Sequence, residues 1–276
     1  MRLSKHHGLG NDFLVVLDER NDDLPAIDGS LAVALCDRRR GIGADGLIHG
    51  GAPDPEQAAA GVEVVMRLYN SDGSRAEISG NGIRCLAQAV ARQRGESDTV
   101  VTVATDAGVR ALVVTPTDDP ARCEVRVPMG APRPGPHIPG PVDELLGVRH
   151  GTVDMGNPHL VILVDDPAAV DLATEGPWLE AQFPAGVNVE YVTVLDGGSA
   201  LELRVWERGA GITEACGSGA CAAAHQAHEW GLVGERVRVV MPGGAAEVEL
   251  VDGDAVLTGP SVLVADIDLV AEGVPA

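Results

Sequence analysis

Apolar and polar residues alternate in many short runs along this chain of 276 residues, a pattern typical of half-buried β-strands. Clusters of turn-forming residues, such as Asp196-Gly197-Gly198, separate the runs. The pattern predicts strands at residues 13–17, 47–48, 62–68, 100–103, 109–114, 124–127, 151–155, 160–164, 187–192, 201–206, 237–240, 246–251 and 255–257. The chain is therefore predicted to consist mainly of short strands joined by tight turns.

Helical sequence is sparse by comparison. Ser30 is expected to cap a short helix over residues 31–35, whose end lies near the cationic run 38–40. Strands and helices do not alternate regularly, and Gly8-Leu9-Gly10 lacks the third glycine of a dinucleotide-binding fingerprint. A Rossmann fold is therefore not expected. The predicted fold class is α+β, with mostly antiparallel sheets folded around a central helix.

Two alanine-rich helices are predicted, and both begin with the same short motif. Ser79-Gly80-Asn81-Gly82 precedes the first helix, and Cys216-Gly217-Ser218-Gly219 precedes the second. The first N–H groups of a helix lack intrahelical partners and the macrodipole is positive there, so such an end binds a carboxylate or phosphate and favours a thiolate. The repeat predicts two related halves that each offer a helix N-terminus and one side chain to a shared site.

The length favours two domains, because a single hydrophobic core stops growing near this size. The run Pro116-Thr117-Asp118-Asp119-Pro120 has the composition of a linker. We therefore expect an N-terminal domain over residues 1–118, completed by residues 264–276, and a C-terminal domain over residues 119–263.

The composition restricts the classes of partner. A formal net charge of −21 argues against nucleic acid or an anionic membrane, because a phosphate-binding surface needs a basic footprint. No apolar run reaches the length of a membrane span, and the start of the chain has no apolar signal-peptide region. Five cysteines without a C-x-x-C pair suggest free thiols in a reducing compartment and no metal site. A cytoplasmic protein is expected.

Nine short motifs, in order and spread over the whole chain, resemble those of the diaminopimelate epimerase family. They are Gly10-Asn11-Asp12-Phe13, Asp37-Arg38 with Gly43-Ala44-Asp45-Gly46, Asn70-Ser71-Asp72-Gly73-Ser74, Gly80-Asn81-Gly82-Ile83-Arg84-Cys85, Gly156-Asn157-Pro158-His159, Asn188-Val189-Glu190, Trp206-Glu207-Arg208-Gly209, Cys216-Gly217-Ser218-Gly219 and Pro242-Gly243-Gly244. The resemblance implies two similar domains, each a β-barrel-like sheet around a helix, with the site in the cleft between them. It also implies a homodimer that interconverts LL- and meso-2,6-diaminopimelate for lysine and cell-wall synthesis.

That reaction explains why a helix start would occur twice. Inverting an amino-acid α-carbon requires one residue to remove a weakly acidic proton and another, on the opposite face, to return one. Pyridoxal phosphate, the usual electron sink, binds through a lysine, and the only lysine here is Lys5 near the N-terminus. No cofactor is therefore expected, and backbone dipoles would have to stabilise the developing charge.

The resemblance also implies roles for individual residues. Cys216 and Ser79 occupy the two acid/base positions, and His159 and Glu207 occupy positions that tune the pKa values of the acid/base pair. Backbone N–H groups of Gly80, Asn81, Gly217 and Ser218 would hold the α-carboxylate. The substrate's distal amino-acid end would bind to Asn11, Asn70, Asn157, Asn188, Glu207 and Arg208. Arginine suits this task, because its pairing with a carboxylate is strong and often bidentate.

The chain departs from the family at Ser79, where the family has a second catalytic cysteine. A hydroxyl is a much weaker acid than a thiol, so it can donate a proton but is a poor base. Ser79 is an engineered replacement, a natural residue activated by its helix end, or the mark of one-base chemistry. The alternatives to diaminopimelate epimerisation are another cofactor-free racemase or isomerase and a non-catalytic amino-acid-binding protein. Cys36, Cys85, Cys123 and Cys221 are expected in the core.

Overall fold

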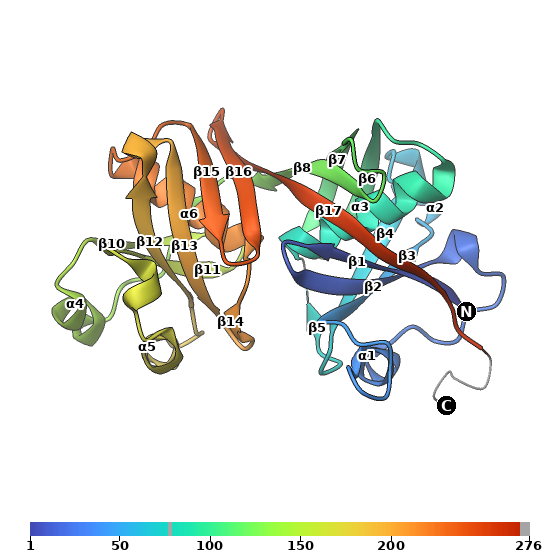
Figure 1. Cartoon of the computed structure of the whole chain (residues 1–276), viewed down its shortest axis with the longest axis horizontal. Helices are drawn as coiled ribbons and strands as arrows, with labels where there is room; N and C mark the ends of the chain where they lie inside the picture. The colour runs from blue at the N-terminus through green and yellow to red at the C-terminus, as the bar shows by residue number, and fades with distance from the viewer. Residues whose placement is uncertain (77–78, 271–276) are drawn as a thin grey trace. The chain divides into compact units, whose positions relative to one another are not determined.

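The computed structural model describes residues 1–76 and 79–270, and its contacts divide the chain into two compact units (Figure 1). Unit 1 comprises Met1–Val127 and Gly259–Ala276, and unit 2 comprises Pro128–Thr258. The bound predicted from linker composition was 118/119, and the second predicted bound was 263/264. The predicted linker 116–120 joins two strands that pair with each other, β7 (Gly108–Pro116) and β8 (Arg122–Gly130).

Unit 1 is a closed circuit of strands. Antiparallel pairs join β1 (Arg2–Gly8) to β2 (Asn11–Leu17), β3 (Gly46–Gly51) to β4 (Val64–Asn70), and β6 (Thr99–Thr105) to β7. Parallel pairs join β2 to β3 and β4 to β6. β8 follows β7, and β17 (Asp254–Asp268) pairs with both β8 and β1, which closes the circuit. The short β5 (Arg75–Ala76) pairs with β4.

Unit 2 repeats this order of pairings. Antiparallel pairs join β10 (His150–Asp154) to β11 (Pro158–Leu163), β12 (Asn188–Leu195) to β13 (Ala200–Glu207), and β15 (Arg236–Met241) to β16 (Gly244–Val251). Parallel pairs join β11 to β12 and β13 to β15. β9 (Arg133–Pro134) and β14 (Gly211–Thr213) are short additions. The shared order extends the repeat seen at the two helix starts to the sheets.

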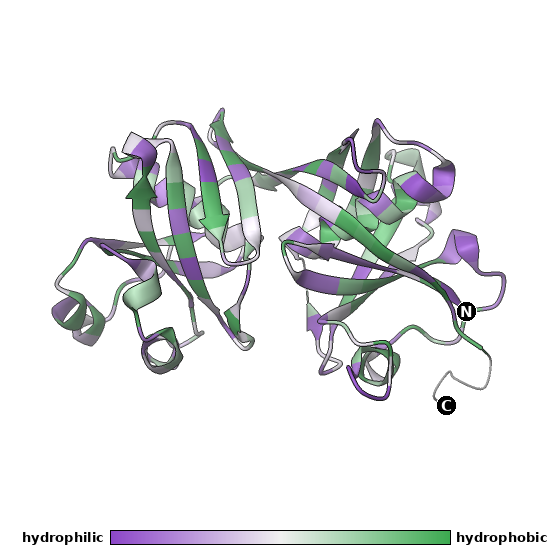
Figure 2. Cartoon of the chain, in the orientation of Figure 1, coloured by the Kyte–Doolittle hydropathy of each residue, from purple (hydrophilic) through white to green (hydrophobic). Residues whose placement is uncertain are grey.

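Each unit wraps its strands around one helix (Figure 1). α3 (Gly80–Arg94) contacts β1, β2, β3, β4, β6 and β7, and α6 (Gly217–Glu229) contacts β10, β11, β12, β13, β15 and β16. Residues 81–91 of α3 are all buried, and most of them are apolar or small, with Asn81, Arg84 and Gln88 as the buried polar residues. Apolar and polar residues alternate along the surrounding strands (Figure 2). The predicted α+β fold, with a barrel-like sheet around a central helix in each half, is confirmed.

The peripheral elements contain the departures from the sequence prediction. α1 (Gly29–Cys36) begins one residue before Ser30, and its cap is Asp28, whose carboxylate accepts the Leu31 N–H. Prediction of Ser30 as the cap was therefore wrong. The prediction also lacked β1 and the helices α2 (Pro55–Ala59), α4 (Gly140–Leu146) and α5 (Leu172–Gln182). All five cysteines are buried and free, and burial was expected for Cys36, Cys85, Cys123 and Cys221. Among the described residues, no helix is long and apolar enough to cross a membrane.

One cluster of buried residues forms the core of unit 2 beneath α5. It includes Ile162, which is 0% exposed, and Leu160, Leu179 and Val189. We expect Ile162→Ala to lower the free energy of unfolding by about 2–5 kcal/mol, because it removes buried apolar surface and leaves a cavity. All three tryptophans (178, 206 and 230) lie in unit 2, so tryptophan fluorescence during denaturation follows this unit.

Ile212→Ala is the matched control, because Ile212 belongs to the same unit but is 56% exposed. It should change the same free energy by less than about 0.5 kcal/mol. Equal losses in the two variants would contradict the assignment of Ile162 to the core.

Candidate functional site

Ser79 and Cys216 occupy equivalent positions in the two units. Each is the N-cap residue of its buried helix, with φ/ψ of −130°/124° for Ser79 and −126°/117° for Cys216. Ser79 Oγ accepts the Gly82 N–H at 3.0 Å, and Cys216 Sγ accepts the Gly219 N–H at 3.4 Å. The extended N-cap backbone and the bond to the third residue on are the standard geometry of a side-chain cap. The structure thus gives both acid/base candidates the same local setting.

The remaining first-turn amides are the groups that can bind an anion. An α-helix leaves its first four N–H groups without intrahelical partners, and at α3 and α6 the side-chain cap uses only one of them. The amide donors of a first helix turn and the positive end of the macrodipole together suit a carboxylate. Each helix start therefore has the general features of an anion-binding helix end.

In unit 1, a buried arginine supports this turn. Arg84 is 0% exposed, and its guanidinium donates to Gly80 O at 2.9 Å, to Asn81 Oδ1 at 2.8 Å and to Pro260 O at 3.2 Å. Gly8 leaves room for it, because a Cβ there would lie 2.9 Å from Arg84 Nη2. Arg84 fixes both residues that were predicted to present backbone amides. Its role was not predicted, although a charged residue inside an apolar helix is a visible signal.

Asn11 lies next to this turn and is tied to a charged network. Asn81 Nδ2 donates to Asn11 Oδ1 at 3.2 Å, and Asn11 Nδ2 donates to Asp45 Oδ2 at 2.8 Å. Arg38 bridges Asp45 and Asp12. Burial raises the pKa of Asp12, but hydrogen bonds from Arg38 and Lys5 outweigh it and hold that pKa below its ordinary value. The network keeps Asn11 in one orientation.

Asn70 differs from the other predicted residues of unit 1. It is the last residue of β4, and its side chain donates to Ser74 Oγ at 2.9 Å within an exposed turn. None of its described hydrogen bonds reaches Asn11, Ser79 or Asn81. The structure therefore brings Asn11, Ser79, Gly80 and Asn81 together and leaves Asn70 as a turn residue with its role still a prediction.

In unit 2, a chain of polar contacts leads away from Cys216. Its Sγ lies 3.6 Å from Ser218 Oγ, and Asn157 Nδ2 donates to Ser218 Oγ at 3.3 Å. His159 Nε2 lies 3.0 Å from Asn157 Oδ1, and His159 Nδ1 lies 2.6 Å from Glu190 Oε1. His159 and Glu190 are both fully buried. Three residues predicted for the site, Asn157, His159 and Ser218, therefore form one connected group with Cys216.

Glu190 has no predicted role, yet it lies beside the helix turn that holds Cys216. A Cβ on Gly219 would be 2.7 Å from Glu190 Oε1 and 3.3 Å from Cys216 Sγ, so only glycine lets both groups approach this backbone. The visible signal is an acidic residue in the otherwise apolar run Val189–Val192 of β12, where every residue is buried. The contact between Glu190 and α6 could not be read from that pattern.

The other predicted residues of unit 2 form a second group. Asn188 Nδ2 donates to Pro158 O at 2.9 Å, and its Oδ1 accepts the Arg208 N–H at 2.9 Å. Arg208 is exposed and donates to Ala185 O. Glu207 accepts a hydrogen bond from Thr213 Oγ1 at 2.5 Å. These contacts place an exposed guanidinium at the end of β13, where it can bind a carboxylate.

Electrostatics disfavour the thiolate of Cys216 in the free protein. Burial raises the pKa of this thiol well above its ordinary value, and a negative charge on Glu207 or on an ionised Glu190 raises it further. Contacts with Ser218 and with the Gly219 N–H oppose the rise. The pKa of Glu190 is also raised, mainly by burial, with His159 opposing the shift and Glu207 adding to it.

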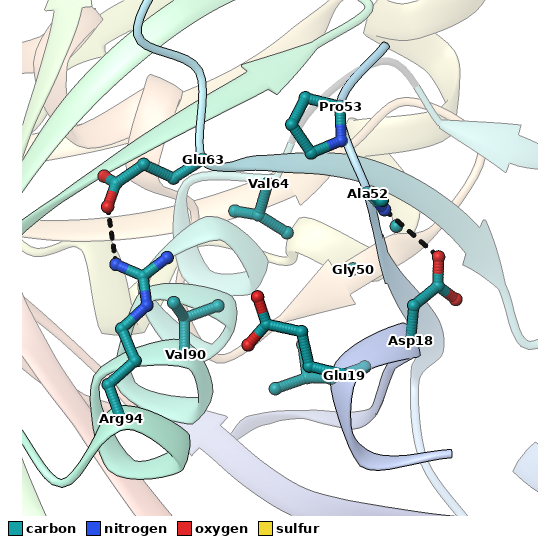
Figure 3. A pocket seen from close by; sticks show the side chains of 11 residues that line it. Asp18, Glu19, Gly50, Ala52, Pro53, Glu63, Val64, Val90 and Arg94 are labelled. Carbon is teal, nitrogen blue, oxygen red and sulfur yellow. Dashed lines mark hydrogen bonds and ion pairs between the residues drawn. The ribbon is translucent and has the colours of Figure 1, made fainter. Parts of the chain in front are cut away.

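Neither a metal site nor the pocket in unit 1 offers an alternative to the residues around Ser79 and Cys216 as the functional site. Among the described residues, no three His, Cys, Asp or Glu side chains are placed to hold a metal ion. Figure 3 shows the pocket, which is lined by Asp18, Glu19, Glu63 and Arg94. Glu63 pairs with Arg94 at 2.5 Å, and Asp18 accepts the Ala52 N–H. The pocket contains none of the residues predicted for the site.

Comparison with known proteins identifies relatives of the whole chain. The sequence model of the family described as diaminopimelate epimerase matches residues 3–134 and 151–264. The chain is 40% identical to diaminopimelate epimerase 1 of Nostoc sp. over 284 residues, which covers 95% of this chain and 96% of that protein. It is 42% identical to diaminopimelate epimerase of Synechocystis sp. over 279 residues, with 95% and 96% covered.

Solved structures share the fold at lower sequence identity. A probable proline racemase from Agrobacterium radiobacter superposes with a TM-score of 0.73 at 18% identity and covers 98% of this chain and 93% of that one. A hydroxyproline epimerase from Agrobacterium vitis gives a TM-score of 0.68 at 17% identity and covers 97% of this chain and 91% of that one. At these identities the similarity establishes the fold alone.

Removing the negative charge of Glu207 should lower the pKa of the Cys216 thiol, because a nearby negative charge disfavours the thiolate. In Glu207→Gln, the amide oxygen can still accept the Thr213 hydroxyl, so only the charge is lost. We expect Cys216 to be alkylated faster at a given pH, as measured by mass spectrometry of its peptide with iodoacetamide.

Glu202→Gln is the control for this change. Glu202 lies on the same strand, β13, but is not among the groups that shift the pKa of Cys216. It should leave the alkylation rate unchanged. A slower reaction in Glu207→Gln than in the parent would contradict the electrostatic assignment.

Proposed function

Because the chain belongs to the diaminopimelate epimerase family, we propose that it interconverts LL- and meso-2,6-diaminopimelate, for lysine and peptidoglycan synthesis, by two-base transfer of the α-proton. The observation that carries the proposal is the pair of equivalent N-cap residues, Ser79 and Cys216, each beside the first-turn amides of its helix. A two-base inversion needs two such groups and one carboxylate binding site.

Each predicted residue has a place in this reaction. Cys216 acts as acid or base on one face of the α-carbon and Ser79 on the other. Backbone amides of the two first helix turns bind the α-carboxylate and stabilise the charge that develops when the proton leaves. His159 and Glu207 adjust the acidity of the acid/base pair. The distal amino-acid end binds Asn11, Asn70, Asn157, Asn188, Glu207 and Arg208.

No cofactor is required in this scheme. A pyridoxal phosphate enzyme would need a lysine for its Schiff base, and Lys5 is the only lysine of the chain. Its Nζ pairs with Asp12 at 2.9 Å and donates to Gly43 O at 2.6 Å, so the amine is already committed to the charged network of unit 1. We propose that the protein works as a cytoplasmic homodimer without nucleic acid or membrane partners.

Incubation of LL-diaminopimelate with the protein in D2O tests the reaction directly. We expect inversion with one deuterium at the new centre, because the proton returned comes from a group that exchanges with solvent. Chiral chromatography and mass spectrometry measure both products. Cys216→Ala should reduce the rate by at least about a hundredfold, the usual contribution of a positioned acid or base.

The alternatives give different products in the same experiment. Exchange with retention would indicate a one-base enzyme, and activity on an amino acid without a distal carboxylate would indicate another racemase. No exchange at all, together with normal substrate binding by Cys216→Ala, would indicate a non-catalytic amino-acid-binding protein.

Ser79→Cys tests whether the hydroxyl limits turnover. A thiol forms its conjugate base far more easily than a hydroxyl, so the variant should gain at least about a hundredfold in kcat in the direction that uses residue 79 as the base. The gain should be smaller in the direction in which residue 79 donates a proton. Equal or lower kcat in both directions would show that Ser79 does not limit the reaction.

A further inference from the structure

Glu190 is a fully buried carboxyl group that the proposed reaction does not use. Its Oε1 lies 2.6 Å from His159 Nδ1, whereas its Oε2 makes no hydrogen bond to any described residue. A buried carboxylate with an oxygen lacking a donor is costly, because neither water nor protein stabilises that charge. Burying a neutral carboxylic acid in the same place costs far less free energy. The contacts therefore favour a proton on Oε1, donated to His159 Nδ1.

This proton sets the direction of the contacts that follow. With Nδ1 as an acceptor, His159 carries its own hydrogen on Nε2, which faces Asn157 Oδ1 at 3.0 Å. Asn157 then donates from Nδ2 to Ser218 Oγ at 3.3 Å. Ser218 accepts that bond, so its hydroxyl hydrogen is available for Cys216 Sγ, 3.6 Å away. Every donor in the chain points toward Cys216.

We propose that Glu190 is a neutral acid and a positioning residue, which acts through His159, Asn157 and Ser218 to direct a hydroxyl hydrogen to Cys216 Sγ. The Gly219 N–H supplies a second donor to the same sulfur at 3.4 Å. Two donors stabilise a thiolate, and donors linked in one direction strengthen each other as charge forms. Only the use of that thiolate as the base for the α-proton rests on the proposed function.

An ionised Glu190 beside a neutral His159 ring would reverse the chain. His159 Nδ1 would then donate to the carboxylate, the Asn157 amide would turn over, and Ser218 would donate to Asn157 and accept from the Cys216 thiol. Both the bare Oε2 and the other charged groups near Glu190 argue against this arrangement. Among the described residues, these groups are Glu207 on β13, which repels a second negative charge, Cys216 on α6 and His159 on β11.

Two substitutions of Glu190 separate the arrangements. Glu190→Gln can donate an amide hydrogen to His159 Nδ1 and so preserves the chain, whereas Glu190→Met cannot. Nitrogen NMR of the His159 ring should show a neutral ring with its hydrogen on Nε2 in the parent and in Glu190→Gln. In Glu190→Met this preference should be lost. A doubly protonated His159 ring in the parent would overturn the proposal.

The thiolate of Cys216 gives the second readout. Its titration is followed by ultraviolet absorbance, as the difference between each protein and its counterpart carrying Cys216→Ala. Glu190→Gln should keep the acid dissociation constant of Cys216 within about threefold of the parent, and Glu190→Met should lower it about tenfold, the effect of one lost hydrogen bond to a charged group. Equal losses in the two variants would overturn the proposal.

Ser218→Ala breaks the chain at its other end if Glu190→Met does not fold, as judged by tryptophan fluorescence. It should lower the same constant about tenfold and leave the His159 ring unchanged. An unchanged constant would contradict the chain. Glu175→Gln is the matched control, because Glu175 accepts a hydrogen bond from Tyr191, the neighbour of Glu190 on β12. This substitution should change neither the His159 ring nor the acid dissociation constant of Cys216. Neither measurement uses substrate, so both remain decisive even if the protein does not epimerise diaminopimelate.

Discussion

The burial of one helix inside each circuit of strands is the constraint on which the rest of the structure depends. α3 and α6 are surrounded by strands, so most of their buried side chains are apolar or small, and Arg84 and Gln88 are the buried polar exceptions inside α3. At the N-terminal end, backbone N–H groups without intrahelical partners must find acceptors. A cap side chain supplies one acceptor for these groups. The proposed anion site would thus be a consequence of how the fold buries its helix.

The two units solve the problem of holding this helix end in different ways. In unit 1, the fully buried guanidinium of Arg84 fixes the turn from inside, and the charged network of Asp12, Arg38 and Asp45 fixes Asn11 from outside. In unit 2, the corresponding positions are linked by neutral polar groups that end at a buried carboxyl. A network of fixed charges holds geometry, whereas a chain of exchangeable hydrogens can also change its direction. The second arrangement would suit the role proposed for Cys216, in which it gains and loses a proton.

Sequence reasoning reached the features that local chemistry determines. The two glycine-rich helix starts, the strand alternation and the turns could be predicted because each depends on neighbouring residues. Asp28 rather than Ser30 caps α1, since two good capping residues lie two positions apart and only the path of the chain decides between them. The helix α5 contains Pro177 and has no apolar stripe, so its sequence carries little helical signal.

Long-range contacts could not be predicted from the sequence, for a different reason. The parallel pairs β2–β3 and β4–β6 join strands that are separated by many residues, and alternation does not reveal a partner. Glu190 and Arg84 were visible as charged residues in apolar segments, but the partner of Glu190 comes from β11 and one partner of Arg84, Pro260, comes from β17. Local sequence propensity predicts individual helices and strands, whereas a functional site depends on which helices and strands come into contact.

Ser79 illustrates how one position can serve two physical demands that conflict. Serine is among the best N-cap residues, because its oxygen accepts a short backbone hydrogen bond, here 3.0 Å from the Gly82 nitrogen. Cysteine at the equivalent position of α6 makes the longer 3.4 Å contact typical of the larger and weaker acceptor sulfur. A helix capped by cysteine therefore gives up part of the cap energy, typically about 1 kcal/mol, in return for a group that ionises more easily. Unit 1 has the stronger cap and the weaker acid, and unit 2 has the reverse. The asymmetry between the halves is thus a choice between holding the helix end and moving a proton there.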